Sequence, residues 1–163
     1  SVYVSFYKGL GGIAGAILAG EVEDIEASKP WKRRHGGDVI SLYPYVVSAK
    51  YAFSLRIDKM TAYHEAAKAV ASRYQSLGSN KVRIIPEQVV TNMFHVHWQL
   101  TVEEVEALVT AVALESGVLL SGYVRQLPEG GCKYETSLGD SYGTIPTEAL
   151  DKAFQVLRHH LVD

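Results

Sequence analysis

One lysine beside a run of glycines is the feature of this chain whose residue types could carry out chemistry. Lys8 follows an apolar alternating stretch, Val2 to Phe6, and precedes Gly9, Gly11 and Gly12. Glycines adopt backbone conformations that a Cβ would block, and they let a ligand approach closely. A lysine whose pKa is lowered by burial or by cationic neighbours can attack a carbonyl carbon and form an imine. The pattern therefore predicts a nucleophilic amine at the end of a strand.

Two simpler interpretations of this loop stay open from the local pattern. Lys8 can be an ordinary solvated lysine, because a glycine loop is a weak signal by itself. The glycines can instead cradle a phosphate. Their spacing, however, matches neither the Walker motif nor a G-x-G-x-x-G at the start of a helix.

The elements around this loop follow from hydrophobic patterning in residues 13–78. Ile13 to Leu18 predicts a second strand, and the acidic residues after Gly20 predict the first turn of a helix that Pro30 ends or kinks. Ser41 is expected to cap a long helical region that closes at Gly78. The basic cluster at residues 33–37, just after Pro30, is either a solvated turn or an anion site.

The second half of the chain alternates between strand and helix signals. Short strands are expected from residue 82, at 91–98, at 118–120 and at 132–137. Thr101 and Glu104 form a capping box that opens one helix ending at Gly117, and a last helix buries an apolar stripe up to Leu161. This order predicts a small α+β sandwich. His95 and His97 share one strand face, but a third metal ligand is lacking, so no metal is expected.

Composition limits the classes of protein to which the chain can belong. With 163 residues, 47% hydrophobic residues and a net charge of −2, it is expected to be globular. Basic residues are too few for a nucleic-acid partner, and no apolar run is long enough for a membrane span. The single cysteine, Cys132, is compatible with a reducing compartment, so a cytoplasmic location is expected.

Several motifs together resemble one family of enzymes. They are Ser5-Phe6-Tyr7-Lys8-Gly9-Leu10-Gly11-Gly12, Gly15-Ala-Ile-Leu-Ala-Gly20, Trp31-Lys-Arg-Arg-His-Gly-Gly37, Thr91-Asn-Met-Phe94 and Leu138-Gly-Asp140. In order and spacing they resemble the threonine aldolase and β-eliminating lyase family, which uses pyridoxal phosphate. The resemblance implies an α/β fold of the aspartate-aminotransferase type, of which this chain is the C-terminal fragment.

The resemblance also implies roles for individual residues. Lys8 corresponds to the lysine that binds the cofactor covalently, with Gly11, Gly12 and Arg33 as further cofactor-binding residues. Many threonine aldolases place another arginine at the position of Ile40, so the phosphate contact between subunits is in question here. Lys133 aligns with the arginine that binds the substrate carboxylate. Arg125, which is close in the sequence, is the alternative residue for this carboxylate contact.

The organisation expected from these observations has three parts. Residues 1–40 are the tail of the large cofactor-binding domain, 41–78 are a connecting helical region, and 79–163 are the small C-terminal domain. The implied activity is cleavage of a β-hydroxy-α-amino acid into glycine and an aldehyde. The alternatives are β-elimination on an aromatic amino acid, or a non-catalytic dimerisation module. The implied partners are the upstream half of the protein and further copies in a homodimer or homotetramer, and the isolated chain is expected to be inactive.

Overall fold

The computed structural model describes residues 1–161, which form two compact units, one of residues 1–59 and one that begins at Met60. The first unit contains the strands β1 (Val2–Ser5) and β2 (Ala16–Ala19), the helices α1 (Val22–Arg34) and α2 (Tyr43–Arg56), and a 3-10 turn. β1 and β2 pair antiparallel, and the loop that joins them carries Lys8.

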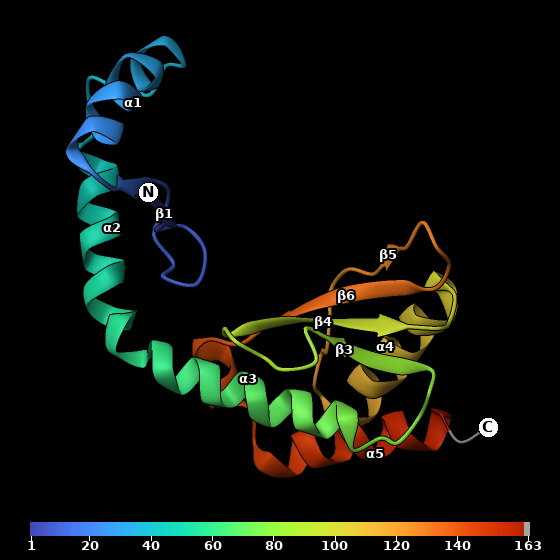
Figure 1. Cartoon of the computed structure of the whole chain (residues 1–163). Helices are drawn as coiled ribbons and strands as arrows, with labels where there is room; N and C mark the ends of the chain where they lie inside the picture. Colours follow the sequence, from blue (N-terminus) through green and yellow to red (C-terminus); the bar gives the residue numbers. More distant parts are fainter. Residues whose placement is uncertain (162–163) are drawn as a thin grey trace. The chain divides into compact units, whose positions relative to one another are not determined.

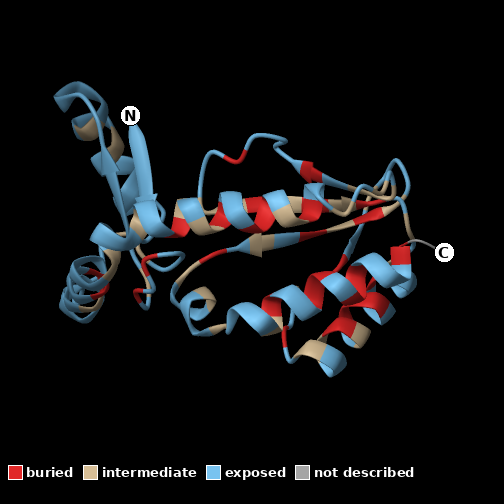
Figure 2. Cartoon of the chain, turned by 90° about the horizontal axis from the view of Figure 1, so that it is seen from below, coloured by how far each residue is buried: buried red, intermediate tan, exposed pale blue. Residues whose placement is uncertain are grey.

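The first unit buries very little of its own surface. Leu10, Gly12, Ala49 and Ala52 are its buried residues, and all four residues of β2 are exposed. Figure 2 shows this unit coloured almost entirely as exposed. Because it buries so few residues, this unit lacks a core of the usual size. Its two-stranded ribbon is only marginally stable by itself.

Two expected helix boundaries in this unit differ in the structure. The expected end of the first helix at Pro30 is wrong, because α1 continues through this proline to Arg34, while the alternative of a kink at Pro30 stays a prediction. Ser41 is not the N-cap of α2: Leu42 occupies that position without a side-chain hydrogen bond, and the proline expected near the first turn lies at N1 or N2. A proline preset for helical φ favours such a start even without a polar cap.

The second unit is a two-layer α+β sandwich. Its antiparallel sheet has the order β3-β4-β6-β5, made of β3 (Val82–Ile85), β4 (Met93–Trp98), β6 (Cys132–Ser137) and β5 (Arg125–Gln126). Figure 1 shows the helices of this unit on one side of the sheet. They are α3 (Met60–Gln75), α4 (Val102–Ser116) and α5 (Thr147–Leu161). The predicted α+β sandwich is confirmed.

Alternation along the central strand explains why one sheet face is covered. In β4, Phe94, Val96 and Trp98 are buried, whereas Met93 and both histidines are half-buried. The buried side chains join the apolar stripes of the helices in one core. The capping box of Thr101 and Glu104 is present, and Gly117 ends α4 in the left-handed conformation, as predicted.

One predicted strand is absent from this sheet. Residues 118–120 form no strand, although Val118 is buried and Leu119 is exposed as in an alternating pattern. The edge position is taken by the two residues of β5, which pair with β6. Within residues 1–161, no helix combines the length and apolarity that crossing a membrane requires.

Candidate functional site

The Lys8 loop is a closed structure held by its own backbone. The Phe6 amide donates to the Gly15 carbonyl at 2.9 Å, which closes the base of the loop above β1 and β2. The Gly11 amide donates to the Lys8 carbonyl at 2.8 Å, and the Gly12 amide to that of Phe6 at 2.6 Å. The carbonyl of Lys8 is therefore fixed within a tight turn.

Two glycines in the loop are required by geometry. Gly11 has φ +77°, in the left-handed region that side chains disfavour. A Cβ on Gly12 would lie 2.9 Å from the Phe6 carbonyl oxygen, so the crossing of the two backbones leaves no room for a side chain. Gly11 and Gly12 thus shape the turn that presents Lys8, which is a structural role. Their predicted contact with a cofactor stays a prediction.

The Lys8 side chain is exposed at the tip of this turn. Among residues 1–161, no carboxylate forms an ion pair with its amine. Its charge helps lower the pKa of the neighbouring Tyr7, after the larger effects of hydrogen bonds from Tyr3 and Ser5. The amine is therefore presented outward on a fixed backbone.

The described cavity of this unit is apolar and does not include Lys8. It has a volume of about 530 Å³ and lies between the β1–β2 hairpin and α2. Phe6, Ile17, Tyr45 and Phe53 are among the side chains that line it. Apart from the amine of Lys50, its walls offer hydrocarbon and aromatic surface, which suits packing against another apolar surface.

Arg33 lies on a different element from Lys8. It is exposed in the last turn of α1, where its carbonyl accepts a hydrogen bond from Gly36 at 3.1 Å. A cation in the last turn of a helix is also favoured by the helix dipole, so this position has a structural explanation as well. The same turn holds Arg34 over the Trp31 ring, at 5.1 Å from the ring centre.

The two predicted carboxylate-binding residues are direct neighbours across two strands. Arg125 of β5 is the register partner of Lys133 of β6. Directly opposed residues place their side chains on the same face of a sheet, about 4.5–5.5 Å apart at Cβ. Both also line a cavity of about 340 Å³. The structure thus brings Lys133 and Arg125 together, on the sheet face that the helices of this unit leave uncovered.

Two further basic residues continue this pair across the whole sheet. Lys133 is the partner of His97, and His97 is the partner of Arg83 on β3. Arg83, His97, Lys133 and Arg125 therefore form one row across four strands, which we call the basic row. Arg83 was not a site candidate from the sequence, and His97 was considered only as a metal ligand, because the row depends on strand register. The sequence signal that these residues offer is a polar residue between two apolar ones, which holds for Arg83, His97 and Lys133.

The basic row changes the protonation of its own histidine. Burial lowers the pKa of His97, and the charges of Lys133, Arg83 and His95 lower it further, while Glu129 acts in the opposite direction. Its Nδ1 atom is buried and has no hydrogen-bond partner among the described residues. Like charges directly opposite one another on a sheet are destabilising, so the row favours an anion.

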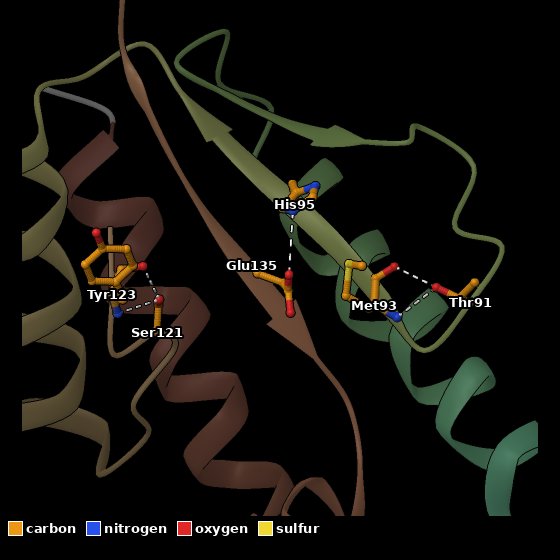
Figure 3. Close-up of polar contacts among 6 residues, drawn as sticks. All are labelled: Thr91, Met93, His95, Ser121, Tyr123 and Glu135. Carbon is orange, nitrogen blue, oxygen red and sulfur yellow. Dashed lines mark hydrogen bonds and ion pairs between the residues drawn. The ribbon is translucent and has the colours of Figure 1, made fainter. Parts of the chain in front are cut away.

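A second polar pair lies beside the basic row. Figure 3 shows His95 on β4 facing Glu135 on β6, with Nε2 and Oε2 separated by 3.7 Å, and the loop of Ser121 and Tyr123 nearby. These four residues line the same 340 Å³ cavity as Lys133 and Arg125. Within the described chain, no three residues of the types His, Cys, Asp and Glu gather as metal ligands would.

Comparison with solved structures identifies the class of protein to which this fold belongs. A scan of protein-family models and a search of curated proteins gave no match. A Listeria monocytogenes EGD-E protein, provisionally described as an L-allo-threonine aldolase, matches 98% of this chain at 48% identity with a TM-score of 0.88. An Exiguobacterium protein, provisionally described as an aromatic amino acid β-eliminating lyase/threonine aldolase, matches 96% at 44% identity with a TM-score of 0.85.

The chain belongs to the threonine aldolase and aromatic amino acid β-eliminating lyase family. It spans 44% of the length of each of these two structures. The mixed α/β fold expected for a C-terminal fragment of such an enzyme is confirmed.

The family implies pyridoxal phosphate as cofactor, and the residues present fit part of its site. Lys8 supplies a primary amine on a fixed turn, without a carboxylate that would hold it in an ion pair. Arg33 offers a guanidinium suited to phosphate, but no described contact brings it to the Lys8 loop. The described cavity beside the loop has mainly apolar and aromatic lining residues, with Lys50 as its one charged residue.

Proposed function

We propose that the protein carrying this chain is a pyridoxal-phosphate-dependent lyase that cleaves a β-hydroxy-α-amino acid into glycine and an aldehyde. The observation that carries the proposal is the exposed Lys8 amine on its hydrogen-bonded turn, in a chain 48% identical to a provisional L-allo-threonine aldolase. The wider class, a lyase of this family, is supported by both matched structures.

Each site residue has a proposed task. When bound, pyridoxal phosphate supplies an electron sink that stabilises negative charge at the substrate Cα. Lys8 would hold the cofactor covalently through Nζ, the nucleophilic nitrogen of this turn. Arg33 would bind the phosphate of the cofactor, and Gly11 and Gly12 shape the turn that presents Lys8. Lys133 and Arg125 hold the substrate carboxylate, with Lys133 as a point charge and Arg125 as the two-pronged donor.

The proposed site is not complete within this chain. The upstream half of the protein is the first proposed partner, because the matched structures are more than twice as long as the chain and the first unit leaves its apolar surface uncovered. A homodimer or homotetramer in the cytoplasm is the proposed working form. By itself, the chain is expected to bind the cofactor weakly and to have no aldolase activity.

Elimination on an aromatic amino acid is the second candidate reaction. It is favoured by the Exiguobacterium structure, whose description joins the two activities. The two reactions differ in which bond is broken and hence in their products. Aldol cleavage gives glycine and an aldehyde. β-Elimination releases the aromatic group as a separate molecule, and water converts the remaining three-carbon fragment into pyruvate and ammonia.

Product analysis on the full-length protein separates the possibilities. The protein is incubated with pyridoxal phosphate and either L-allo-threonine or an aromatic amino acid, and glycine, aldehyde and pyruvate are measured. The proposal expects glycine and acetaldehyde, and their loss in Lys8→Ala. Formation of pyruvate from the aromatic amino acid would instead support the second candidate reaction, β-elimination. No product, with no spectral change on adding the cofactor, would support a non-catalytic dimerisation module instead.

A further inference from the structure

The Lys8 loop is attached to α2 by side chains that are far away in the sequence. Ser48 Oγ accepts a hydrogen bond from the Ile13 amide at 3.0 Å, at the end of the loop nearer β2. Arg56 Nη1 donates to the Leu10 carbonyl at 3.0 Å, within the turn that contains Lys8. The two hydrogen bonds therefore hold the loop from both sides of the glycines.

The helix surface beneath the loop is shaped for this contact. Ala49 and Ala52 are its buried residues, and their small side chains let the loop backbone approach. The position of a Cβ on Gly12 would be 3.5 Å from the Ala49 Cα, and one on Gly11 would be 3.0 Å from Arg56 Nη1. The guanidinium thus lies directly against the turn, and the absence of side chains at both glycines is what permits it.

One buried side chain and one aromatic contact accompany these hydrogen bonds. Leu10, two residues after Lys8, is buried with 8% exposure in a unit that buries few residues. The Phe6 ring packs edge-on against that of Phe53 on α2, with ring centres 6.4 Å apart. The loop is therefore fixed at its base, at its turn and at its exit, while the side chain of Lys8 stays exposed.

We propose that Arg56 and Ser48 are positioning residues that set where the Lys8 amine is presented. The inference rests on the proposed role of Lys8 and extends it. Arg56 acts through the Leu10 carbonyl, which lies in the turn closed by the bond from the Gly11 amide to the Lys8 carbonyl. Loss of either side chain releases the turn and lets the amine sample positions away from a carbonyl carbon, which lowers the effective concentration of the nucleophile.

A cofactor-free experiment tests the attachment first. Trypsin cleaves after lysine, so the Lys8–Gly9 bond reports how often the turn opens, and its cleavage is followed by mass spectrometry in the full-length protein. Because a hydrogen bond to a charged group is lost, Arg56→Ala should speed this cleavage about tenfold, and Ser48→Ala should speed it by about threefold. Ser54→Ala is the matched control: it removes a hydroxyl from the same helix that donates to the Lys50 carbonyl at 2.9 Å.

A spectroscopic measurement then separates positioning from simple stabilisation. With pyridoxal phosphate added, the midpoint pH of the visible absorbance band that depends on Lys8 should shift in Arg56→Ala and return in Arg56→Lys, which keeps a donor for the Leu10 carbonyl. Ser54→Ala should behave as the unmodified protein.

Each outcome decides the matter. Faster cleavage together with a shifted midpoint supports the proposal. Unchanged cleavage in both Arg56→Ala and Ser48→Ala overturns the attachment, and faster cleavage with an unmoved midpoint overturns the positioning role. If the unmodified protein shows no Lys8-dependent band, the proposed function fails and the positioning role with it, while the cleavage rates still report whether α2 holds the loop.

Discussion

At the scale of single residues, the basic row places cationic side chains next to His97 on the uncovered face of the sheet. His97 lies between Arg83 on one side and Lys133 on the other, and its Nδ1 has no partner among residues 1–161. An anion placed over the row would relieve the repulsion. Its position beside the proposed carboxylate-binding residues makes His97 a reporter of that site.

Removing one charge should be visible in the titration of His97. In Lys133→Gln we expect the pKa of His97 to rise. Burial lowers this pKa most, Lys133 is the first of the charges that lower it further, ahead of Arg83 and His95, and Glu129 raises it. The measurement is an NMR titration of the His97 ring protons. Lys68→Gln on α3 is the control, since Lys68 pairs with Glu65 and is not among these charges.

The same shift predicts the direction of a pH effect on stability. Since the folded-state pKa of His97 is lowered, the unfolded chain binds the proton more readily. The free energy of unfolding should therefore decrease as the pH falls below about 6.5, the ordinary value for histidine. Lys133→Gln should make this decrease smaller. A His97 pKa that is the same in both proteins would contradict the role given to Lys133.

Sequence reasoning reached Lys8 and the Lys133–Arg125 pair but not the whole row. The glycines beside Lys8 are a weak signal by themselves, and it was the family resemblance that made Lys8 and Lys133 site candidates. Arg83 lies 14 residues before His97 in the chain, and only the pairing of β3 with β4 makes them neighbours. Register is set by tertiary packing of one sheet face, which a local pattern does not contain.

At the scale of elements, the turn between β5 and β6 sets the register that brings Arg125 opposite Lys133. The Leu127 amide donates to the Gly131 carbonyl at 3.0 Å, and Gly130 and Gly131 have φ of +98° and +73°. A Cβ on Gly131 would overlap the carbonyl oxygen of Trp98, whereas one on Gly130 would meet nothing within 4 Å. The two neighbouring glycines thus differ in the room that each leaves for a side chain.

Alanine substitutions should rank according to this difference. Gly131→Ala combines an unfavourable φ with backbone overlap and should lower the free energy of unfolding by at least about 2 kcal/mol. Gly130→Ala carries the φ penalty alone and should cost about 1 kcal/mol. Gly122→Ala, with open space and no positive φ, should change little. Urea unfolding measures all three, and equal effects of Gly131→Ala and Gly130→Ala would contradict the overlap.

Secondary structure was predictable where the signal is local and uncertain where tertiary contacts decide. The capping box at Thr101 and the glycine stop at Gly117 were read correctly because both bonds lie within one turn. Pro30 does not end the first helix, since α1 continues through it to Arg34. Residues 118–120 have strand-like composition, yet the edge strand of the sheet is Arg125–Gln126, because these two residues pair with β6.

At the scale of the whole molecule, the two units differ sharply in how much apolar surface they bury. The second unit has a continuous core that includes Phe94, Trp98 and Leu157, whereas the first leaves Ile13, Val22 and Trp31 more than half exposed. Exposed apolar surface of this extent marks a surface that another part of a protein covers. The chain spans 44% of each matched structure, and the upstream half proposed above as a partner would supply that cover.

Hydrogen exchange on the isolated chain should reveal this difference. We expect the amides of β1 and β2 to exchange at least about a hundredfold faster than those of β4 and β6, because local stability follows buried contacts. In the full-length protein the amides of β1 and β2 should become protected. Equal protection of both sheets in the isolated chain would contradict the account of the first unit as an incomplete structure.

The central claim is that the nitrogen of Lys8 binds pyridoxal phosphate, and chemical trapping tests it most directly. The full-length protein is incubated with the cofactor, reduced with sodium borohydride, digested, and analysed by mass spectrometry for lysine bearing the reduced cofactor. The account predicts modification at Lys8, and its loss in Lys8→Ala but not in Lys50→Ala. Modification at Lys50 or another lysine instead, with Lys8 unmodified, would contradict it.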